Sequence, residues 1–256
     1  MPSLEIHQFP CLSDNYGVLV RDPVRGVVAS IDAPSAEDVR KALKDTGWKL
    51  SYILTTHHHA DHTAGNLALK AETDCVIIGP RGEAAKIPGI DTEVGEGDAF
   101  RLGGYQVQVI ETPGHTLGHI AYVIPQANVA FVGDTLFAMG CGRVNEGTME
   151  QMWLSLAKIA ALPPETVIYC GHEYTVSNAK FAATIEPENN ALAARLADVT
   201  ALRAAGRPTL PTRLDQELAT NVFLRVNSAP IRKRLNLESA PDWKVFAELR
   251  ERKNKA

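Results

Sequence analysis

Short apolar runs bounded by glycine and proline turns fill the first two-thirds of the chain, and they predict β-strands. Residues 105–110 alternate apolar and polar positions with the period of two that a half-buried strand requires. Further strands are predicted at residues 16–20, 27–31, 52–55, 75–78, 120–124, 129–132 and 166–170. Amphipathic helices are predicted at residues 35–45, with Ser35 as the N-cap, and at residues 148–162. This mixture predicts an α/β domain over residues 1–172.

The pattern changes after about residue 175, where helical periodicity replaces the short apolar runs. Helices are predicted at residues 178–185, 187–205 and 241–254. Pro187 and Pro241 stand where a first helical turn tolerates proline, and Gly206 stands where a helix commonly ends. We therefore expect residues 173–256 to form a smaller, all-α C-terminal domain.

Composition and charge exclude several classes of protein. Of the 256 residues, 45% are hydrophobic and 22% are charged, which excludes a disordered or fibrous chain. The net charge of −4 gives no support for broad binding to nucleic acids or membrane surfaces. No apolar run is long enough for a transmembrane helix, no signal peptide is apparent, and four separated cysteines form no CxxC motif. We expect a monomeric cytoplasmic protein that acts on a small molecule, without nucleic-acid or membrane partners.

Histidines concentrate directly after the strand predicted at residues 52–55. Residues 57–62 contain four of the eight histidines, together with Asp61. By composition, six positions would hold about 0.2 of a histidine. Imidazole nitrogens and carboxylate oxygens are the ligands that zinc and similar metals prefer. In an extended loop His57 and His59 point to the same side, so this segment predicts part of a metal site.

Three further residues of the same chemical types follow predicted strands. His115, Asp134 and His172 each come just after a strand, and each has a glycine beside it. Functional side chains are commonly placed on such loops by a rigid scaffold. An incidental histidine cluster would not be accompanied by three more ligand-type residues at strand ends, so a metal centre is the better interpretation. The pattern gives His58, His119 and Cys141 no place among the ligands, and we expect them to support the loops.

The order of these residues resembles the dinuclear metallo-β-lactamase superfamily, whose pattern is matched by His57-x-His59-x-Asp61-His62 and the three later ligands. The resemblance implies a four-layer αββα sandwich. It implies that His57, His59 and His115 hold one metal, that Asp61, His62 and His172 hold the second, and that Asp134 bridges both. It also implies a metal-bridging hydroxide, held with the help of Asp134 and Asp61, as the nucleophile. The expected cofactors are two divalent ions per chain, with zinc favoured and iron or manganese as alternatives.

Longer segments are similar to the glyoxalase II family, the hydroxyacylglutathione hydrolases. These segments are Cys141-Gly142-Arg143, Glu146-Gly147-Thr148, residues 171–175, residues 186–189 and residues 220–225, the last with Val222 where proline is usual. The resemblance implies hydrolysis of S-D-lactoylglutathione to D-lactate and glutathione, the second step of methylglyoxal degradation in the glyoxalase pathway. It implies that a C-terminal helical domain binds glutathione and that Arg143, Tyr174, Arg250 and Lys253 contact the substrate. Asn145 departs from the family, which often has an aromatic residue there.

Two alternatives remain at this stage. The first is a glutathione persulfide dioxygenase of the same superfamily, which would use one iron. The second is a metal- or glutathione-binding protein without catalysis. The predicted helical tail with Arg250 and Lys253 disfavours the first alternative, and the complete ligand set with Asp134 disfavours the second.

Overall fold

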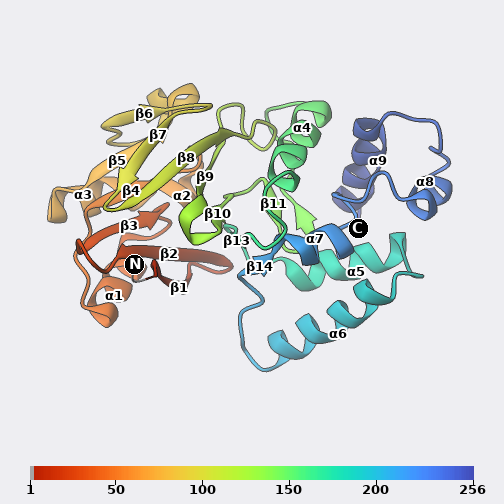
Figure 1. Cartoon of the computed structure of the whole chain (residues 1–256), viewed down its shortest axis with the longest axis horizontal. Helices are drawn as coiled ribbons and strands as arrows, with labels where there is room; N and C mark the ends of the chain where they lie inside the picture. Colours follow the sequence, from red (N-terminus) through yellow and green to blue (C-terminus); the bar gives the residue numbers. More distant parts are fainter. Residues whose placement is uncertain (1–2) are drawn as a thin grey trace. The chain divides into compact units, whose positions relative to one another are not determined.

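The computed structural model describes residues 3–256, and these residues form two compact units (Figure 1). The first unit runs to Glu111 and resumes at Thr116–Gly133, and the second comprises Thr112–His115 and Asp134–Ala256. The chain therefore crosses between the units three times. This division differs from the single boundary expected after residue 172.

A six-stranded sheet forms one layer of the first unit. Its strands, in order, are β1 (Glu5–Cys11), β2 (Asn15–Asp22), β3 (Val27–Ile31), β4 (Tyr52–Leu54), β5 (Val76–Pro80) and β6 (Thr92–Val94). The first three strands are antiparallel and the remaining pairs are parallel. The parallel strands end at the same edge of the sheet, so β3 and β4 deliver the residues that follow them, Asp32 and Thr55, to one place.

Helices α1 (Ala36–Thr46) and α3 (Asn66–Thr73) contribute to the hydrophobic core on one face of this sheet. The Ser35 side chain accepts a hydrogen bond from Asp38 N at 3.2 Å, which confirms the predicted N-cap of α1. The buried side chains of this core include Leu19, Val28, Val39, Ala42, Ile53, Leu69 and Ile77. The segment after the histidine-rich residues forms two helices, α2 (Ala60–Thr63) and α3, since the chain turns at Gly65.

The first unit also contains four antiparallel strands of a second sheet. They are β7 (Ala99–Leu102), β8 (Tyr105–Glu111), β9 (Ile120–Ile124) and β10 (Val129–Phe131), and the unit has two 3₁₀ helices, η1 (Arg81–Lys86) and η2 (Pro125–Ala127). Tyr122 of β9 is fully buried, and its hydroxyl donates to Thr55 O at 2.7 Å. This bond joins the two sheets at the end of β4, directly before the histidine-rich segment.

The second unit is mainly helical. Its helices are α4 (Met149–Ala160), α5 (Thr175–Ile185), α6 (Asn190–Ala204), α7 (Leu214–Thr220), α8 (Ala229–Leu235) and α9 (Asp242–Asn254). Its strands are β11 (Leu136–Phe137), β12 (Gly140–Cys141), β13 (Val167–Tyr169) and β14 (Thr212–Arg213), which pair as β11 with β12 and β13 with β14. Helix α4 begins with a capping box between Thr148 and Gln151.

Three predicted helix starts differ from those observed in the second unit. Helix α5 begins at Thr175, three residues before its predicted start. Helix α6 begins at Asn190 because the side chain of Asn189 caps it, accepting from Leu192 N at 3.1 Å. Pro187 therefore precedes the helix instead of lying in its first turn. Pro241 is likewise the N-cap residue of α9. Among residues 3–256, no helix is long and apolar enough to span a bilayer.

Candidate metal centre

The first unit positions His57, His59, Asp61 and His62 on the segment between β4 and α2. His57 and His62 are buried, at 0% and 1% exposure, whereas the Asp61 side chain is 43% exposed. The Nε2 atom of His57 lies 3.2 Å from Nδ1 of His59, and Nε2 of His62 lies 3.7 Å from Oδ2 of Asp61. This segment therefore presents two pairs of closely spaced potential ligand atoms.

Asp32 orients the imidazole rings of this segment. Its buried carboxylate accepts from Thr56 N at 2.7 Å and from Thr56 Oγ1 at 2.9 Å, and its Oδ2 lies 2.7 Å from Nδ1 of His62. A carboxylate only accepts, so Nδ1 of His62 carries the proton and Nε2 carries the lone pair. Nδ1 of His57 lies 3.0 Å from Thr56 Oγ1, whose own proton is directed to Asp32. His57 therefore also carries its lone pair on Nε2.

The second unit brings His115, Asp134 and His172 together. The Nε2 atoms of His115 and His172 lie 3.4 Å and 3.3 Å from the same oxygen of Asp134, Oδ2. Nδ1 of His115 lies 2.9 Å from the carbonyl oxygen of Arg143, which only accepts and thus leaves the lone pair on Nε2. The ring of Tyr174 stacks on His172 with a centroid distance of 4.8 Å and an interplanar angle of 3°.

These spacings fit the donor set of a metal ion. Bonds from zinc to histidine nitrogen are about 2.0–2.1 Å, so two ligand atoms of one tetrahedral ion lie about 3.3 Å apart. The separations of 3.2–3.4 Å between His57 and His59, and from Asp134 to His115 and His172, match this value. Several sets of three His, Asp or Glu side chains have ligand atoms within 4.8 Å of one another and could hold a metal ion. These sets include all seven predicted ligands and also His58 and Glu146. Metal ligands characteristically have their other ring nitrogen bonded to protein, as His57, His62 and His115 have here.

Gly133 permits the turn that leads from β10 into Asp134. Its φ is +47°, and a Cβ atom there would lie 2.6 Å from Nε2 of His119 and 2.7 Å from Thr56 Oγ1. His119 is fully buried and its ring stacks on that of His57 with a centroid distance of 4.8 Å. A larger residue at position 133 would therefore displace the neighbours of His57.

Glu83 of η1 connects two of the loops in the first unit. Its buried carboxylate accepts from His58 N and Gly118 N, each at 2.8 Å, and its Oε2 lies 2.8 Å from Nδ1 of His58. His58 thus contacts Glu83 while its neighbours His57 and His59 contact each other. The carboxylate fixes the backbone of the histidine segment at His58.

We expect Glu83→Ala to weaken metal binding about 10- to 100-fold, the usual cost of removing a residue that supports a metal ligand. Metal retained after dialysis against a graded chelator series would measure the effect. Glu83→Gln should recover part of it, because an amide oxygen can still accept from a backbone N–H. Glu72→Ala, which removes an exposed carboxylate paired with Arg40, is the matched control. Unchanged metal retention in Glu83→Ala would contradict this supporting role.

Comparison with known proteins identifies the family. The sequence model of the metallo-beta-lactamase superfamily matches residues 22–172, and that of the hydroxyacylglutathione hydrolase C-terminus matches residues 173–256. A protein of Brucella anthropi named hydroxyacylglutathione hydrolase is 57% identical over 253 residues, covering 99% of this chain and 97% of that protein. The chain belongs to the hydroxyacylglutathione hydrolase family. A relative of the same name from Chelativorans sp. is 54% identical, covering 98% and 99% of the two chains.

A solved structure supports the fold. The crystal structure of ETHE1 from Myxococcus xanthus aligns with a TM-score of 0.67 and 26% identity, covering 97% of this chain and 98% of that one. The expected fold class, a metallo-β-lactamase-like α+β sandwich followed by a C-terminal helical region, is thereby confirmed.

Three of the four expected substrate contacts of this hydroxyacylglutathione hydrolase family member are at least partly exposed. Arg143 is exposed, Tyr174 is 37% exposed, and Lys253 is half-buried, with its Nζ donating to Ser177 Oγ at 2.8 Å. Arg250 differs, at 4% exposure, and its guanidinium donates to Cys141 O at 2.8 Å. Burial, together with the positive charges of Arg250 and Arg143, lowers the pKa of Lys253. Positive potential therefore gathers around this end of α9.

Cys141 has the character of a structural residue. Burial raises the pKa of its thiol to about 11, although the charge of Arg250 and a hydrogen bond from it act in the opposite direction. The thiol is protonated at neutral pH and is therefore a poor nucleophile. This agrees with its interpretation as a small loop residue.

Sequence analysis missed the residues that orient the ligands. Asn15 donates to both Asp61 O, at 3.1 Å, and Asp61 Oδ2, at 3.2 Å. Asp32 directly follows the strand predicted at residues 27–31, the same signal that located the ligands, so that signal could have identified it. Asn15 carried no comparable signal, because it precedes the strand predicted at residues 16–20. Glu83 follows the strand predicted at residues 75–78, but only the structure shows that its carboxylate reaches His58 and Gly118.

Proposed function

We propose that this protein hydrolyses the thioester of S-D-lactoylglutathione to D-lactate and glutathione, using two divalent metal ions per chain, most simply zinc. The observation that carries the proposal is the convergence of His115 and His172 on one oxygen of Asp134. Together with His57, His59, Asp61 and His62, these residues would supply three terminal ligands to each metal, and the Asp134 carboxylate would serve both. His115 and Asp134 also lie where the chain crosses between its compact units, so three chain crossings connect the two sets of ligands.

The chain's own residues would hold and orient such a centre. When bound, two divalent cations lower the pKa of a water molecule and stabilise negative charge on the thioester carbonyl oxygen. Asp32 and the Arg143 carbonyl hold imidazole rings with Nε2 available, and Asn15 holds the carboxylate of Asp61. The protonated Cys141 thiol offers no competing nucleophile. Hydrolysis would therefore need no covalent acyl-enzyme.

The second unit supplies cations suited to glutathione, which carries two carboxylates. Burial and the charges of Arg250 and Arg143 lower the pKa of Lys253, and an anionic ligand would relieve the repulsion among these cations. A cavity of about 520 Å³ lies beside Lys253 and is lined by Ser177, Lys180 and Phe181 among others. We propose that Arg143, Tyr174 and Lys253 contact glutathione, and that Arg250 supports them by holding Cys141.

Lys253→Ala is expected to raise KM for the glutathione thioester about tenfold and to leave kcat nearly unchanged. The lysine would contact a part of the substrate that does not change during reaction, so ground state and transition state lose the same interaction. One charge-assisted hydrogen bond accounts for the magnitude. Steady-state kinetics would measure it, with the exposed Lys255→Ala as the matched control. An unchanged KM, or an equal loss for a small thioester without carboxylates, would contradict glutathione binding by Lys253.

An oxygen-free assay tests the proposed reaction against the two alternatives. Hydrolysis consumes no oxygen, so S-D-lactoylglutathione should be cleaved at the same rate with and without air. Glutathione persulfide should not be oxidised in air. Oxygen consumption with the persulfide would favour a dioxygenase, and no turnover of either compound by the metal-loaded protein would favour a binding protein. We propose further that the protein acts as a cytoplasmic monomer, which sedimentation and cell fractionation would test.

A further inference from the structure

A cavity of about 710 Å³ lies in the first unit, at the strand ends opposite to the metal-ligand segment. Strand β2 ends there at Asp22, and β3 leaves from the same turn and runs toward Asp32. Strand β8 likewise begins at Tyr105 beside the cavity, and η2 joins β9 to β10 along its edge. The cavity is therefore formed by three turns that play no part in the proposed reaction.

Hydrogen bonds to the Asp22 carboxylate hold one wall of the cavity in place. Asp22 is 1% exposed, and its carboxylate accepts from Val24 N and from Gly104 N, each at 2.8 Å. Gly103, with φ of +61°, allows this approach, because a Cβ atom there would lie 2.3 Å from Asp22 Oδ2. The two turns are thus fixed against each other, and the wall is ordered before any ligand binds.

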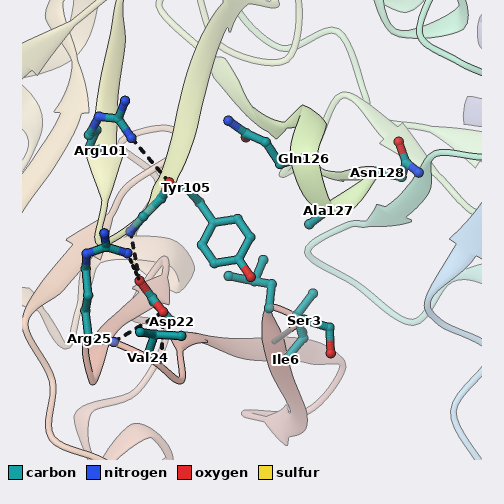
Figure 2. A pocket seen from close by; sticks show the side chains of 12 residues that line it. Ser3, Ile6, Asp22, Val24, Arg25, Arg101, Tyr105, Gln126, Ala127 and Asn128 are labelled. Carbon is teal, nitrogen blue, oxygen red and sulfur yellow. Dashed lines mark hydrogen bonds and ion pairs between the residues drawn. The ribbon is translucent and has the colours of Figure 1, made fainter. Parts of the chain in front are cut away.

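Two arginines converge on this wall (Figure 2). Arg101 Nη1 donates to Gly104 O at 3.3 Å, and Arg25 Nη1 lies 3.4 Å from Asp22 Oδ2. With one carboxylate between two guanidinium groups, this part of the lining carries one net positive charge. Each guanidinium has five N–H donors and uses one side-chain nitrogen here within residues 3–256, so donors remain for an anion. The planar fork of arginine matches carboxylate and phosphate oxygens.

The rest of the lining is apolar or neutral. Val24 is 63% exposed, and Ile6 and the ring of Tyr105 also line the cavity (Figure 2). Gln126 extends toward Arg101 in the same view, and Asn128 also lines the cavity. A ligand that covered Val24 would remove apolar surface from water. Such a ligand needs an anionic group at one end and a flat apolar body.

We propose that this cavity binds a small organic anion, with a phosphate or carboxylate held by Arg25 and Arg101 and an apolar body placed against Val24 and Tyr105. The cavity volume lies within the range of about 300–1,000 Å³ that is usual for small-molecule sites. The inference goes beyond the proposed hydrolysis and does not depend on it, since none of these residues supports a metal ligand.

Backbone amide NMR of the full, metal-loaded protein tests this site with phenyl phosphate, benzoate and inorganic phosphate as probes. Saturable shifts are expected at Val24, Arg25 and Gly104 with phenyl phosphate or benzoate, and the better of the two identifies the preferred anionic group. Inorganic phosphate should bind at least tenfold more weakly, because it lacks the apolar body. No shift at these amides up to millimolar probe, or equal affinity for inorganic phosphate, would overturn the proposal.

Variants separate this site from the metal centre, where anions can also bind. The double variant Arg25→Ala/Arg101→Ala should weaken the binding reported by the Gly104 amide at least tenfold. Thioester hydrolysis should be unchanged in this variant, and Arg40→Ala, which removes an exposed arginine paired with Glu72, should change neither property. Persistence of the Gly104 shifts with unchanged affinity in the double variant would also overturn the proposal.

Discussion

Asp134→Ala is expected to lower kcat/KM for S-D-lactoylglutathione about a thousandfold or more and to reduce metal occupancy at both positions. His115 and His172 approach the same carboxylate oxygen of Asp134, at 3.4 and 3.3 Å, so its removal would delete the charge that the proposed centre needs at both metal positions. Loss of one well-placed electrostatic group typically costs two to three orders of magnitude, and loss of a metal costs more. Steady-state kinetics and elemental analysis of the same preparation would measure both effects.

The exposed Asp198 of α6 offers the matched control for this substitution, since Asp198→Ala removes the same charge from the same unit. That variant should keep full activity and full metal content. Full double occupancy in Asp134→Ala would contradict a bridging role. Loss of only one metal would show that Asp134 serves a single position.

Glu217→Ala is expected to lower the free energy of unfolding by about 3–5 kcal/mol, because it leaves a buried partner charge uncompensated. Glu217 is fully buried and its carboxylate pairs with Arg195. The same carboxylate accepts from Met139 N at 2.8 Å and from Asn221 Nδ2 at 3.0 Å, which ties α7 to the β11–β12 hairpin. Urea denaturation followed by circular dichroism would measure the change.

Two substitutions on the same helix calibrate this result. Glu217→Gln retains an acceptor and should cost less than Glu217→Ala. Asp215→Ala breaks an exposed pair with Arg213, whose side chain is 54% exposed, and should cost about 1 kcal/mol or less. If Glu217→Ala cost no more than Asp215→Ala, the network around Arg195 would not contribute to stability.

The predicted and observed elements agree best where a short stretch of sequence determines the structure by itself. The bounds predicted for β3 and β9 are those observed, and the N-cap of α1 is Ser35 as predicted. The predicted start of α6 was wrong because two signals lie close together in the sequence. Pro187 is compatible with a first helical turn, but Asn189 caps the helix and sets its start at Asn190. Strand β14, two residues long, pairs only with β13, and such a short strand leaves no periodic signal in the sequence.

The candidate ligands could be predicted because each follows a strand and has a distinctive chemical type. Apart from Asp32, which also follows a predicted strand, their supports could not be predicted, because hydrogen bonds such as those of Glu83 to His58 and Gly118 depend on tertiary placement. The three-residue spacing of Arg250 and Lys253 correctly gives one helix face. The spacing does not predict how deeply each side chain is buried. Arg250 is buried, and its Cζ lies 5.2 Å from the centroid of the Phe223 ring.

Stepwise metal loading of the apoprotein tests the central claim, a two-metal thioester hydrolase, most directly. The apoprotein should be nearly inactive toward S-D-lactoylglutathione. Activity measured against added zinc should rise until about two ions are bound per chain and then remain constant, because both positions contribute to the reaction. Substantial hydrolysis by the metal-free protein, or full activity with one ion per chain, would contradict the account.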